Sequence, residues 1–423
     1  MIKRPFFSLT KPGLNYDLIE SDPKEPKPIP IPSNLILLLN QAIDTEKQMA
    51  IKKGAAVEKG EKLSLYSDST EYVISPVSGT ITTIDVFTDN LGNTATSLSI
   101  NTVQNQTTDT TSMTYDLKDN ITSADAFLRT LPGAPPLQIL ARENVKIDTI
   151  VITGADMDLL STTNQYVALR YPDEISEGAK LLKQITQAKK ICITIPEKLN
   201  ISKIPDAVQV IKTDMTYPSN LPAMILKNHL NMILPAGKTP EDMGVCFMSA
   251  EAVISLAKAY QTKTASFEKI VTVIGKQGTP YRVKATIGTP INQIFNTFSI
   301  HVNEQDRIII GGPMKGYSTF THHHPVQADT DTVIIQDKDV LPELSDTPCI
   351  NCGRCIRICP ANIPVNILVR YLEANQYEEA ADNFDLESCI DCGLCTYTCL
   401  AHIPLNQYIR LGKHELLKLR ADA

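Results

Sequence analysis

Eight of the ten cysteines lie near the C-terminus, in two runs that share the spacing C-x₂-C-x₂-C-x₃-C and start forty residues apart. Thiolates at this spacing are the ligands of two-cluster ferredoxins, in which the fourth cysteine of each run binds the cluster of the other run. The spacing therefore predicts two [4Fe–4S] clusters with crossed ligands. The first cluster is assigned to Cys349, Cys352, Cys355 and Cys399. The second cluster is assigned to Cys389, Cys392, Cys395 and Cys359.

Zinc is the alternative metal that such cysteines could bind. Zinc takes four ligands per ion, usually as two cysteine pairs separated by a dozen or more residues, and the two four-cysteine runs fit that arrangement poorly. Gly353 and Gly393 follow the second cysteine of each run, where the chain has to wrap closely round a cluster. Cys192 and Cys246 stand alone between apolar residues. We interpret them as small buried hydrophobic residues rather than ligands.

The sequence repeat continues beyond the cysteines, so the elements that position them are also duplicated. An Ala-(Asn/His)-Ile-Pro motif follows both runs, and each copy is expected to continue as a helix, over residues 365–375 and 405–418. These elements predict a small helical domain made of two ligand loops, each followed by a helix. Arg354 and Arg357 place positive charge beside the first loop, which favours the reduced state of a cluster there and predicts the higher potential for it.

Composition and charge narrow the class of protein. The chain has 423 residues, of which 43% are hydrophobic and 21% charged, as in a globular protein of several domains. A net charge of −7 disfavours nucleic acid as a partner. The longest strongly apolar stretch, residues 35–39, is far shorter than the ~20 residues that span a bilayer. Thiolate ligands favour a reducing compartment, so we expect a cytoplasmic protein that is soluble or reaches a membrane through partner subunits.

The fold class predicted for the chain is multidomain α/β. Residues 1–120 pair glycine turns with short alternating apolar runs and resemble a lipoyl-like barrel-sandwich domain, without a lysine placed for modification. Residues 121–265 alternate apolar strands with amphipathic helices, which favours a parallel sheet covered on both faces. Residues 266–330 have the strand and helix order of a β-grasp (SLBB-like) domain. Residues 331–423 form the cluster domain, and residues 330–344 are expected to link the last two.

In this order the segments resemble the C subunit of Rnf-type ferredoxin:NAD oxidoreductase complexes. The resemblance runs along most of the chain and is carried by Ser-Pro-Val-Ser-Gly at 75–79, Gly-Gly-Pro-Met at 311–314 and the cysteine repeat. It implies an α/β domain like that of the flavin subunit of respiratory complex I, with FMN and NAD bound there. The α/β segment is also similar to the A subunit of Na⁺-translocating NADH:quinone reductase, a homologue that has neither a flavin nor the dicluster domain.

The stretch that corresponds to the family's flavin and nucleotide loop departs from the family pattern. The family has a glycine-rich loop whose backbone amides cradle phosphate, whereas here Gly133 stands alone among three prolines, which supply no N–H donors. Asp156 and Asp158 occupy the positions of the family's glutamates. These three residues are the candidate remnants of a flavin or nucleotide site. We prefer to interpret them as turn residues and do not expect FMN.

Two further motifs are interpreted as structural. The Gly-Gly-Pro-Met motif at 311–314 follows an apolar run and is expected to form a turn that places the β-grasp domain against its neighbours. The histidine run is expected to lie in a solvated loop, because adjacent residues cannot all face one metal ion from a helix or strand. Its members are His322, His323 and His324.

The leading functional hypothesis is an electron-relay subunit that passes electrons through two clusters in series and has no catalytic residues of its own. An FMN-containing NADH dehydrogenase subunit is the alternative that the family implies, and a docking scaffold for the cluster domain is the third hypothesis. The expected partners are other subunits of a membrane redox complex, together with ferredoxin or another soluble electron carrier. The expected location is the cytoplasmic face of the membrane.

Overall fold

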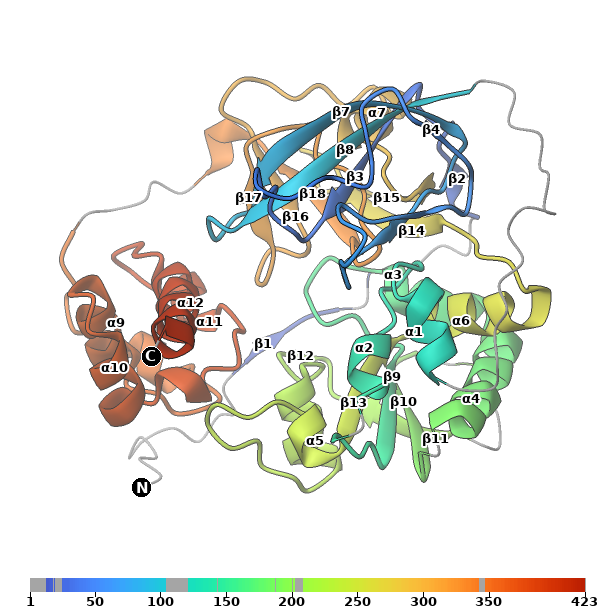
Figure 1. Ribbon diagram of the computed structural model, residues 1–423. Helices are drawn as coiled ribbons and strands as arrows, with labels where there is room; N and C mark the ends of the chain where they lie inside the picture. Colours follow the sequence, from blue (N-terminus) through green and yellow to red (C-terminus); the bar gives the residue numbers. More distant parts are fainter. Residues whose placement is uncertain are drawn as a thin grey trace.

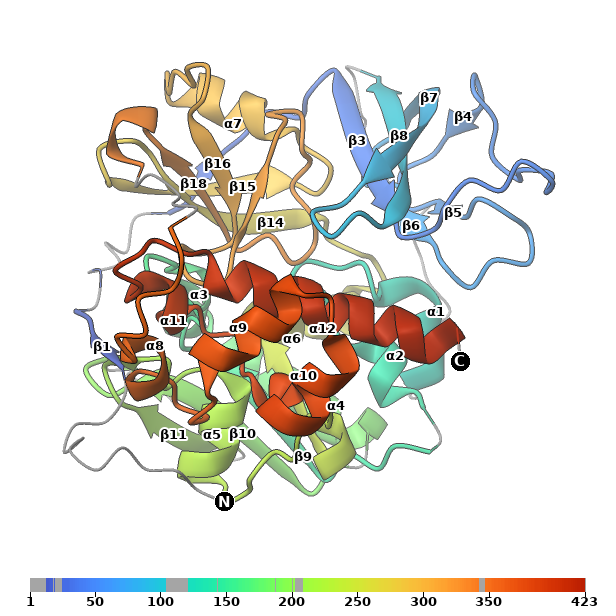
Figure 2. The same cartoon turned by 90° about the vertical axis from the view of Figure 1, so that its left-hand side faces the viewer.

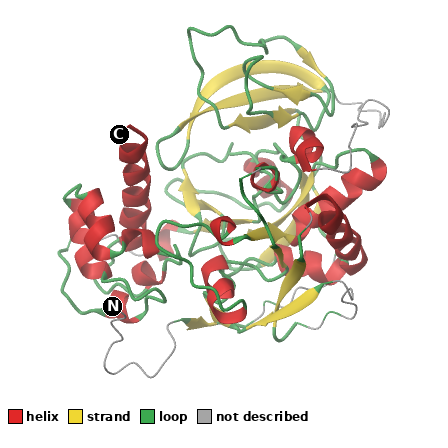
Figure 3. Cartoon of the chain, turned by 60° about the horizontal axis from the view of Figure 1, so that its bottom comes forward, coloured by secondary structure: helices red, strands yellow, loops and turns green. Residues whose placement is uncertain are grey.

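The computed structural model describes residues 13–17, 19, 25–103, 121–142, 144–186, 188–199, 201, 208–341 and 347–422. These residues form a barrel, a parallel α/β sheet, a mixed sheet and a C-terminal group of helices that holds both cysteine runs (Figure 1). The C-terminal helices stand apart from the strand-rich units (Figure 3). None of the described helices is both long enough and apolar enough to cross a bilayer.

The barrel is built from antiparallel strands whose side chains alternate between the core and the surface. In β3 (Asn34–Leu39) the side chains of Leu35, Leu37 and Leu39 are buried and those between them are more exposed, which is the period of two expected for a strand. Its sheet has the order β3-β8-β7-β4, and β5 pairs with β6 beside it. The remaining bounds are β4 (Ala56–Val57), β5 (Lys62–Leu63), β6 (Val73–Ile74), β7 (Gly79–Thr88) and β8 (Thr94–Thr102).

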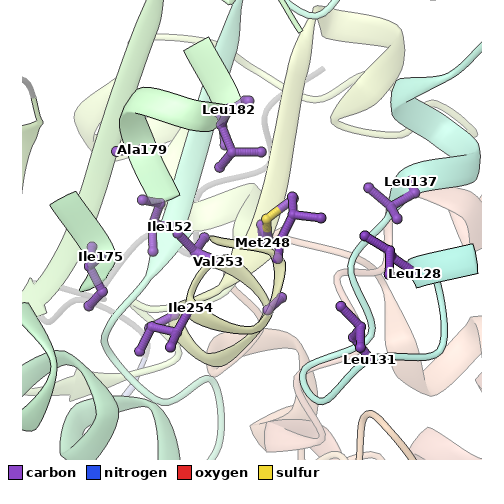
Figure 4. Packing of buried hydrophobic residues seen from close by; sticks show 14 of the residues in the cluster. Leu128, Leu131, Leu137, Ile152, Ile175, Ala179, Leu182, Met248, Val253 and Ile254 are labelled. Carbon is purple, nitrogen blue, oxygen red and sulfur yellow. The ribbon is translucent and has the colours of Figure 1, made fainter. Parts of the chain in front are cut away.

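The α/β unit has a parallel four-stranded sheet in the order β11-β10-β9-β13. Alternate residues of β9 (Thr149–Thr153) enter different cores: Ile150 and Ile152 pack toward α4 and α6, whereas Val151 packs toward α5. The sheet is therefore covered on both faces, as predicted, and Figure 4 shows the larger of the two cores. The other strands are β10 (Lys190–Pro196), β11 (Gln209–Thr213) and β13 (Val245–Ser249). The helices are α1 (Ile121–Leu128), α2 (Leu137–Leu140), α3 (Thr163–Arg170), α4 (Pro172–Thr186), α5 (Pro222–His229) and α6 (Ala250–Thr262).

The mixed sheet has six strands in the order β17-β16-β18-β14-β15-β2, and α7 (Ile291–Thr297) packs on it. One sequence prediction is wrong here. The linker was expected to start at residue 330, but Thr332–Gln336 forms β18 between β14 and β16, because this apolar run completes the core of the sheet. The last residues of the expected linker, 342–344, lie outside the described part of the chain. The other strands are β2 (Lys27–Pro28), β14 (Glu268–Ile274), β15 (Pro280–Thr286), β16 (Arg307–Ile310) and β17 (Tyr317–Thr319).

The C-terminal helices follow the duplicated pattern of the sequence. Each cysteine run enters a short helix, α8 (Arg354–Arg357) or α11 (Leu394–Tyr397), and a longer helix follows, α9 (Val365–Glu373) or α12 (Leu405–Asp422). The two longer helices lie where the sequence predicted helices. They pack together through the shared core of this unit. A further helix, α10 (Tyr377–Phe384), was not predicted.

The units are joined by buried polar contacts and by the N-terminal segment. Lys269 on β14 is fully buried, with its Nζ 2.5 Å from Glu251 Oε2 on α6 and 2.7 Å from Asp331 Oδ1 before β18. Burial acts to lower the pKa of Lys269, but the charges of Asp331 and Glu251 outweigh it and raise the pKa. Upstream, β1 (Leu14–Asn15) pairs with β12 (Thr216–Tyr217) in the α/β unit, and β2 pairs with β15 in the mixed sheet. Figure 2 shows the barrel and the mixed sheet side by side above the helices.

Candidate metal centres

The two cysteine loops have the same backbone course. At three equivalent positions in each loop the residue has a left-handed conformation, with φ values of 55°, 68° and 57° in the first loop and 55°, 72° and 51° in the second. Asparagine, aspartate and glycine adopt this region most readily, and a left-handed residue turns successive backbone N–H groups toward one side. The residues are Asn351, Gly353 and Asn362 in the first copy, and Asp391, Gly393 and His402 in the second.

The thiols act on one another in two sets, which we call the first group and the second group. Burial is the largest cause that raises the pKa of Cys355 to about 11, and the charges of Cys349, Cys352 and Cys399 raise it further. The last of these three belongs to the other run. In the second group, burial raises the pKa of Cys392 to about 12, with added contributions from Cys389 and Cys359. The charges of these two residues and of Cys392 also raise the pKa of the buried Cys395. The neighbours that act on Cys355 and on Cys392 therefore come from both cysteine runs.

Backbone amides point at the sulfur atoms of these groups. The amide of Asp391 donates to Cys389 Sγ at 3.4 Å. Cys359 is half-buried, and desolvation raises the pKa of its thiol, while the amides of Ile363, Ala361 and Asn362 hydrogen-bond it and act to lower the pKa. Amides in such positions stabilise thiolates and tune the potential of a bound cluster.

The donor set and the space around it fit iron–sulfur clusters. The four thiols of the first group line a cavity of about 640 Å³ together with Gly353 and Leu405. In the described residues no three His, Cys, Asp or Glu side chains lie close enough together to hold one metal ion.

The second loop is covered by other parts of the chain. A methyl group at Gly393 would lie 2.5 Å from the carbonyl oxygen of Met314, so the Gly-Gly-Pro-Met turn rests directly on this loop. Arg410 on α12 donates to Asp391 Oδ1 and to the carbonyl of Lys315, both at 2.7 Å. Tyr217 donates its hydroxyl to the carbonyl of Cys392 at 2.6 Å. The turn therefore holds the mixed sheet against the cluster domain, as predicted for residues 311–314.

Sequence reasoning missed Tyr217 and Arg410 as residues that hold the second loop. For Arg410 a signal was available, because the repeat extends into the long helices. Arg370 is its counterpart forty residues earlier, and it donates to Asn351 Oδ1 at 3.0 Å, as Arg410 donates to Asp391. For Tyr217 the sequence carries no comparable signal, since its contact joins two separate units.

The candidate remnants of a flavin or nucleotide site make contacts within the protein. The Gly133 amide donates to the carbonyl of Ala328, and a side chain at Gly133 would collide with the backbone of α6. Asp156 is buried and accepts hydrogen bonds from the amides of Asn164 and Gln165 at the start of α3. The polar groups of both residues are therefore used by neighbouring segments of the fold.

Asp158 joins the α/β unit to the turn at 311–314. Its carboxylate accepts the amide of Met314 at 3.1 Å and that of Lys315 at 2.6 Å. Burial raises the pKa of Asp158 to about 6, and the amides of Lys315, Leu159 and Met314 act against this rise. The polar atoms of Asp158 are thus used in a contact between units.

The structure confirms one of two other predictions and part of the second. Cys192 and Cys246 are fully buried in the α/β unit, as predicted. His322 and His323 are exposed, as predicted for a solvated loop. The prediction is wrong for His324, which is buried against Tyr317 and Pro325, and burial lowers its pKa.

Comparison with protein families assigns both ends of the chain. Residues 17–105 match the RnfC barrel sandwich hybrid domain, and residues 341–400 match a 4Fe-4S dicluster domain. The chain is thus a mixed α/β protein with an N-terminal barrel-sandwich domain and a C-terminal 4Fe–4S dicluster domain.

Relatives with known names cover most of the chain. It is 29% identical over 418 residues to the C subunit of the ion-translocating oxidoreductase complex of Pectobacterium carotovorum, covering 93% of this chain and 55% of that protein. It is 26% identical over 280 residues to the C subunit of the proton-translocating ferredoxin:NAD(+) oxidoreductase complex of Clostridium ljungdahlii, covering 64% of this chain and 61% of that protein. These matches confirm the resemblance to Rnf C subunits that the sequence predicted. The chain spans little more than half the length of the Pectobacterium relative.

A comparison with solved structures found a partial match. The crystal structure of NAD⁺-reducing [NiFe]-hydrogenase in the H₂-reduced state covers 74% of this chain and 65% of its own chain, with a TM-score of 0.42 and 13% identity.

Proposed function

We propose that this chain is the electron-relay subunit of an Rnf-type oxidoreductase complex and passes single electrons between partner proteins. The observation that supports the proposal is that thiols of the two runs act on one another, since the charge of Cys399 raises the pKa of Cys355 and that of Cys359 raises the pKa of Cys395. This is the ligand arrangement of two-cluster ferredoxins. The named relatives are C subunits of ion-translocating oxidoreductase complexes, which supports a complex of this kind as the setting.

The residues of the site would have three roles in a relay. The eight cysteines would hold two [4Fe–4S] clusters, and each cluster, when bound, accepts or gives one electron. The loop amides would stabilise charge on the ligand sulfurs, as the amide of Asp391 does for Cys389. Tyr217, Arg410 and the turn at 311–314 would fix the second loop relative to the rest of the protein.

We further propose that FMN and NAD are not bound through Gly133, Asp156 and Asp158. A flavin or nucleotide site needs free backbone amides for phosphate. Here the Gly133 amide is bonded to Ala328, and both aspartates accept amides from their own chain. These residues do not fit that role, so the electrons would come from other proteins and go to other proteins.

The setting follows from the same proposal. The partners would be the other subunits of a membrane redox complex and a soluble carrier such as ferredoxin, and the chain would lie on the cytoplasmic face of the membrane. The mixed sheet would be an SLBB-like β-grasp domain, and the α/β unit would be related to the flavin subunit of respiratory complex I. The domain boundaries would fall near residues 120 and 265.

Anaerobic reconstitution with iron and sulfide tests the proposal. The expected result is about eight irons per chain, no flavin in the visible spectrum, and clusters that dithionite reduces but NADH alone does not. Bound FMN together with bleaching of the clusters by NADH would establish the dehydrogenase alternative instead. About two zinc ions per chain would refute the clusters altogether.

A further inference from the structure

The two cysteine loops share one backbone course but differ in how much of their surface is covered. In the second loop Cys392 is 7% exposed and Leu394 is fully buried. At the equivalent positions of the first loop, Cys352 and Arg354 are both exposed. Ile350, which precedes them, is 59% exposed. The repeat therefore has one covered loop and one uncovered loop with the same backbone course.

The cover on the second loop shows what such a loop can bind. Arg410 holds its own loop through Asp391 and uses its remaining N–H groups to bind the carbonyls of Lys315 and Gly316 in the covering turn. Its counterpart Arg370 holds the first loop through Asn351 in the same way. In the described residues no polypeptide segment rests on the first loop as the turn at 311–314 rests on the second.

The first loop is also surrounded by positive charge and by exposed apolar side chains. Arg354, Arg370, Ile350 and Leu400 line the same cavity as the first thiol group, and Arg357 lines the adjoining cleft. Glu373 is the acidic residue among those that line this cavity. We call the surface made by Ile350, Cys352, Arg354, Arg357, Arg370 and Leu400 the first-loop face.

Among the described residues, no acidic side chain pairs with the arginines of the first-loop face. Within residues 13–341 and 347–422, as far as these are described, none of the three arginines forms an ion pair. Arg357 and Arg370 instead donate to a carbonyl and an amide oxygen, which keeps their positive charge available to a partner. An apolar centre with an arginine rim is the usual composition of a protein-binding surface. This local charge is opposite in sign to the net charge of −7 of the whole chain.

We propose that the first-loop face docks a small acidic electron-transfer protein, and that the cluster held by Cys349, Cys352, Cys355 and Cys399 is the one that exchanges electrons with it. This inference rests on the proposed relay function and adds the docking face, the charge of the partner and the order of the clusters. One electron would leave the reduced partner and be gained by the cluster that the first thiol group would hold, without a bond or proton being exchanged. The second group, covered by the turn at 311–314, comes next in the series.

The test measures binding as well as electron transfer, with a purified acidic ferredoxin as the probe. The oxidised ferredoxin is titrated into the reconstituted chain in a calorimeter at low and at high salt, and the rate at which the reduced ferredoxin reduces the chain is followed by stopped flow. Attraction between exposed charges is screened within about 10 Å at 0.1 M salt, so binding and rate are both expected to fall as salt rises.

The variant that tests the face is Arg354→Glu/Arg357→Glu. It is expected to weaken binding and to slow transfer by about tenfold or more at low salt, because charge reversal turns electrostatic steering into repulsion. Arg354→Glu alone leaves the bond from Arg357 to the Cys352 carbonyl in place, and a smaller loss in the same direction is expected. The matched control is Lys52→Glu/Lys53→Glu on the barrel, which makes the same change in net charge at exposed residues. The control is expected to stay within about twofold of the unaltered chain.

The outcomes separate this inference from the relay proposal. Equal losses in the arginine and lysine variants, or binding that does not depend on salt, would overturn the docking face. If a basic cytochrome c binds the unaltered chain more tightly than the ferredoxin does, the acidic partner is wrong. Failure of the relay proposal would look different, because the chain would then hold no clusters that dithionite reduces, whatever binds to it.

Discussion

Cys359 lies in the first cysteine run, but its thiol belongs to the second group. Its charge raises the pKa of Cys389, Cys392 and Cys395. Cys359 is not among the main causes of the raised pKa of Cys355. We therefore expect Cys359→Ala to damage the cluster of the distant run and to leave intact the cluster beside it in sequence.

The size of the effect follows from this grouping. If each group holds one four-iron cluster, as proposed, loss of the second cluster lowers the iron content from about eight to about four per chain. The first group keeps all four of its thiols, and its signal in electron paramagnetic resonance should be unchanged in position and intensity. Iron analysis and the resonance spectrum of the anaerobically reconstituted variant measure both quantities.

Two variants provide matched controls. Cys399→Ala removes the crossed ligand of the other group and should give the reciprocal result, with loss of the cluster held by Cys349, Cys352 and Cys355. Cys246→Ala removes a fully buried thiol of the α/β unit and should leave all the iron in place. If Cys359→Ala abolishes the signal of the Cys349 group and spares the other, the ligands are not crossed and the assignment is wrong.

Three further predictions concern the contacts between units. Lys269→Met leaves two acidic partners without their cation and should lower the free energy of unfolding by about 3–5 kcal/mol. Lys284→Met, in an exposed pair on the next strand, should cost under about 1 kcal/mol, and equal losses in urea unfolding would contradict this reasoning. Gly393→Ala should speed hydrogen exchange in the turn at 311–314, whereas Gly353→Ala should not, because a methyl group there meets only an arginine side chain. Since burial raises the pKa of Asp158 to about 6, folding favours its protonated form, and the stability that this carboxyl contributes is lost as the pH rises through 6. The unfolding free energy of the unaltered chain should therefore fall relative to Asp158→Asn between about pH 5 and 7.5, by about 1 kcal/mol, and a flat difference would refute the shift.

The elements that local patterns specify could be predicted from the sequence. Alternation along β3, apolar runs such as β9 and the helical spacing of α4 all gave elements close to those observed. The 4Fe–4S dicluster domain could be predicted because the cysteine spacing within each run is that of a cluster-binding loop. In these cases the residues near in sequence carry the information.

The rest depends on partners that are distant in the sequence. Thr332–Gln336 looks like part of a linker until its pairing with β14 and β16 is known. In α10 the side chain of Ala380 alone is buried, so the apolar stripe that identifies a helix is weak. His324 is buried because Tyr317 and Phe87 pack beside it from other segments. The covers over Cys392 and Gly393 likewise come from other units.

The place of β2 in the mixed sheet has a consequence for how the chain is made. Lys27–Pro28 pairs with β15, whose residues lie some 255 positions later, and the sheet is complete only when β18 has been synthesised. The barrel is thus an insertion within another domain, and it can fold on the ribosome long before that domain closes. Until then the side chain of Ile29, which is 6% exposed in the folded protein, has no sheet core to pack against. Pairing across so long a loop is slow, so closure of this sheet is expected to be a late step in folding.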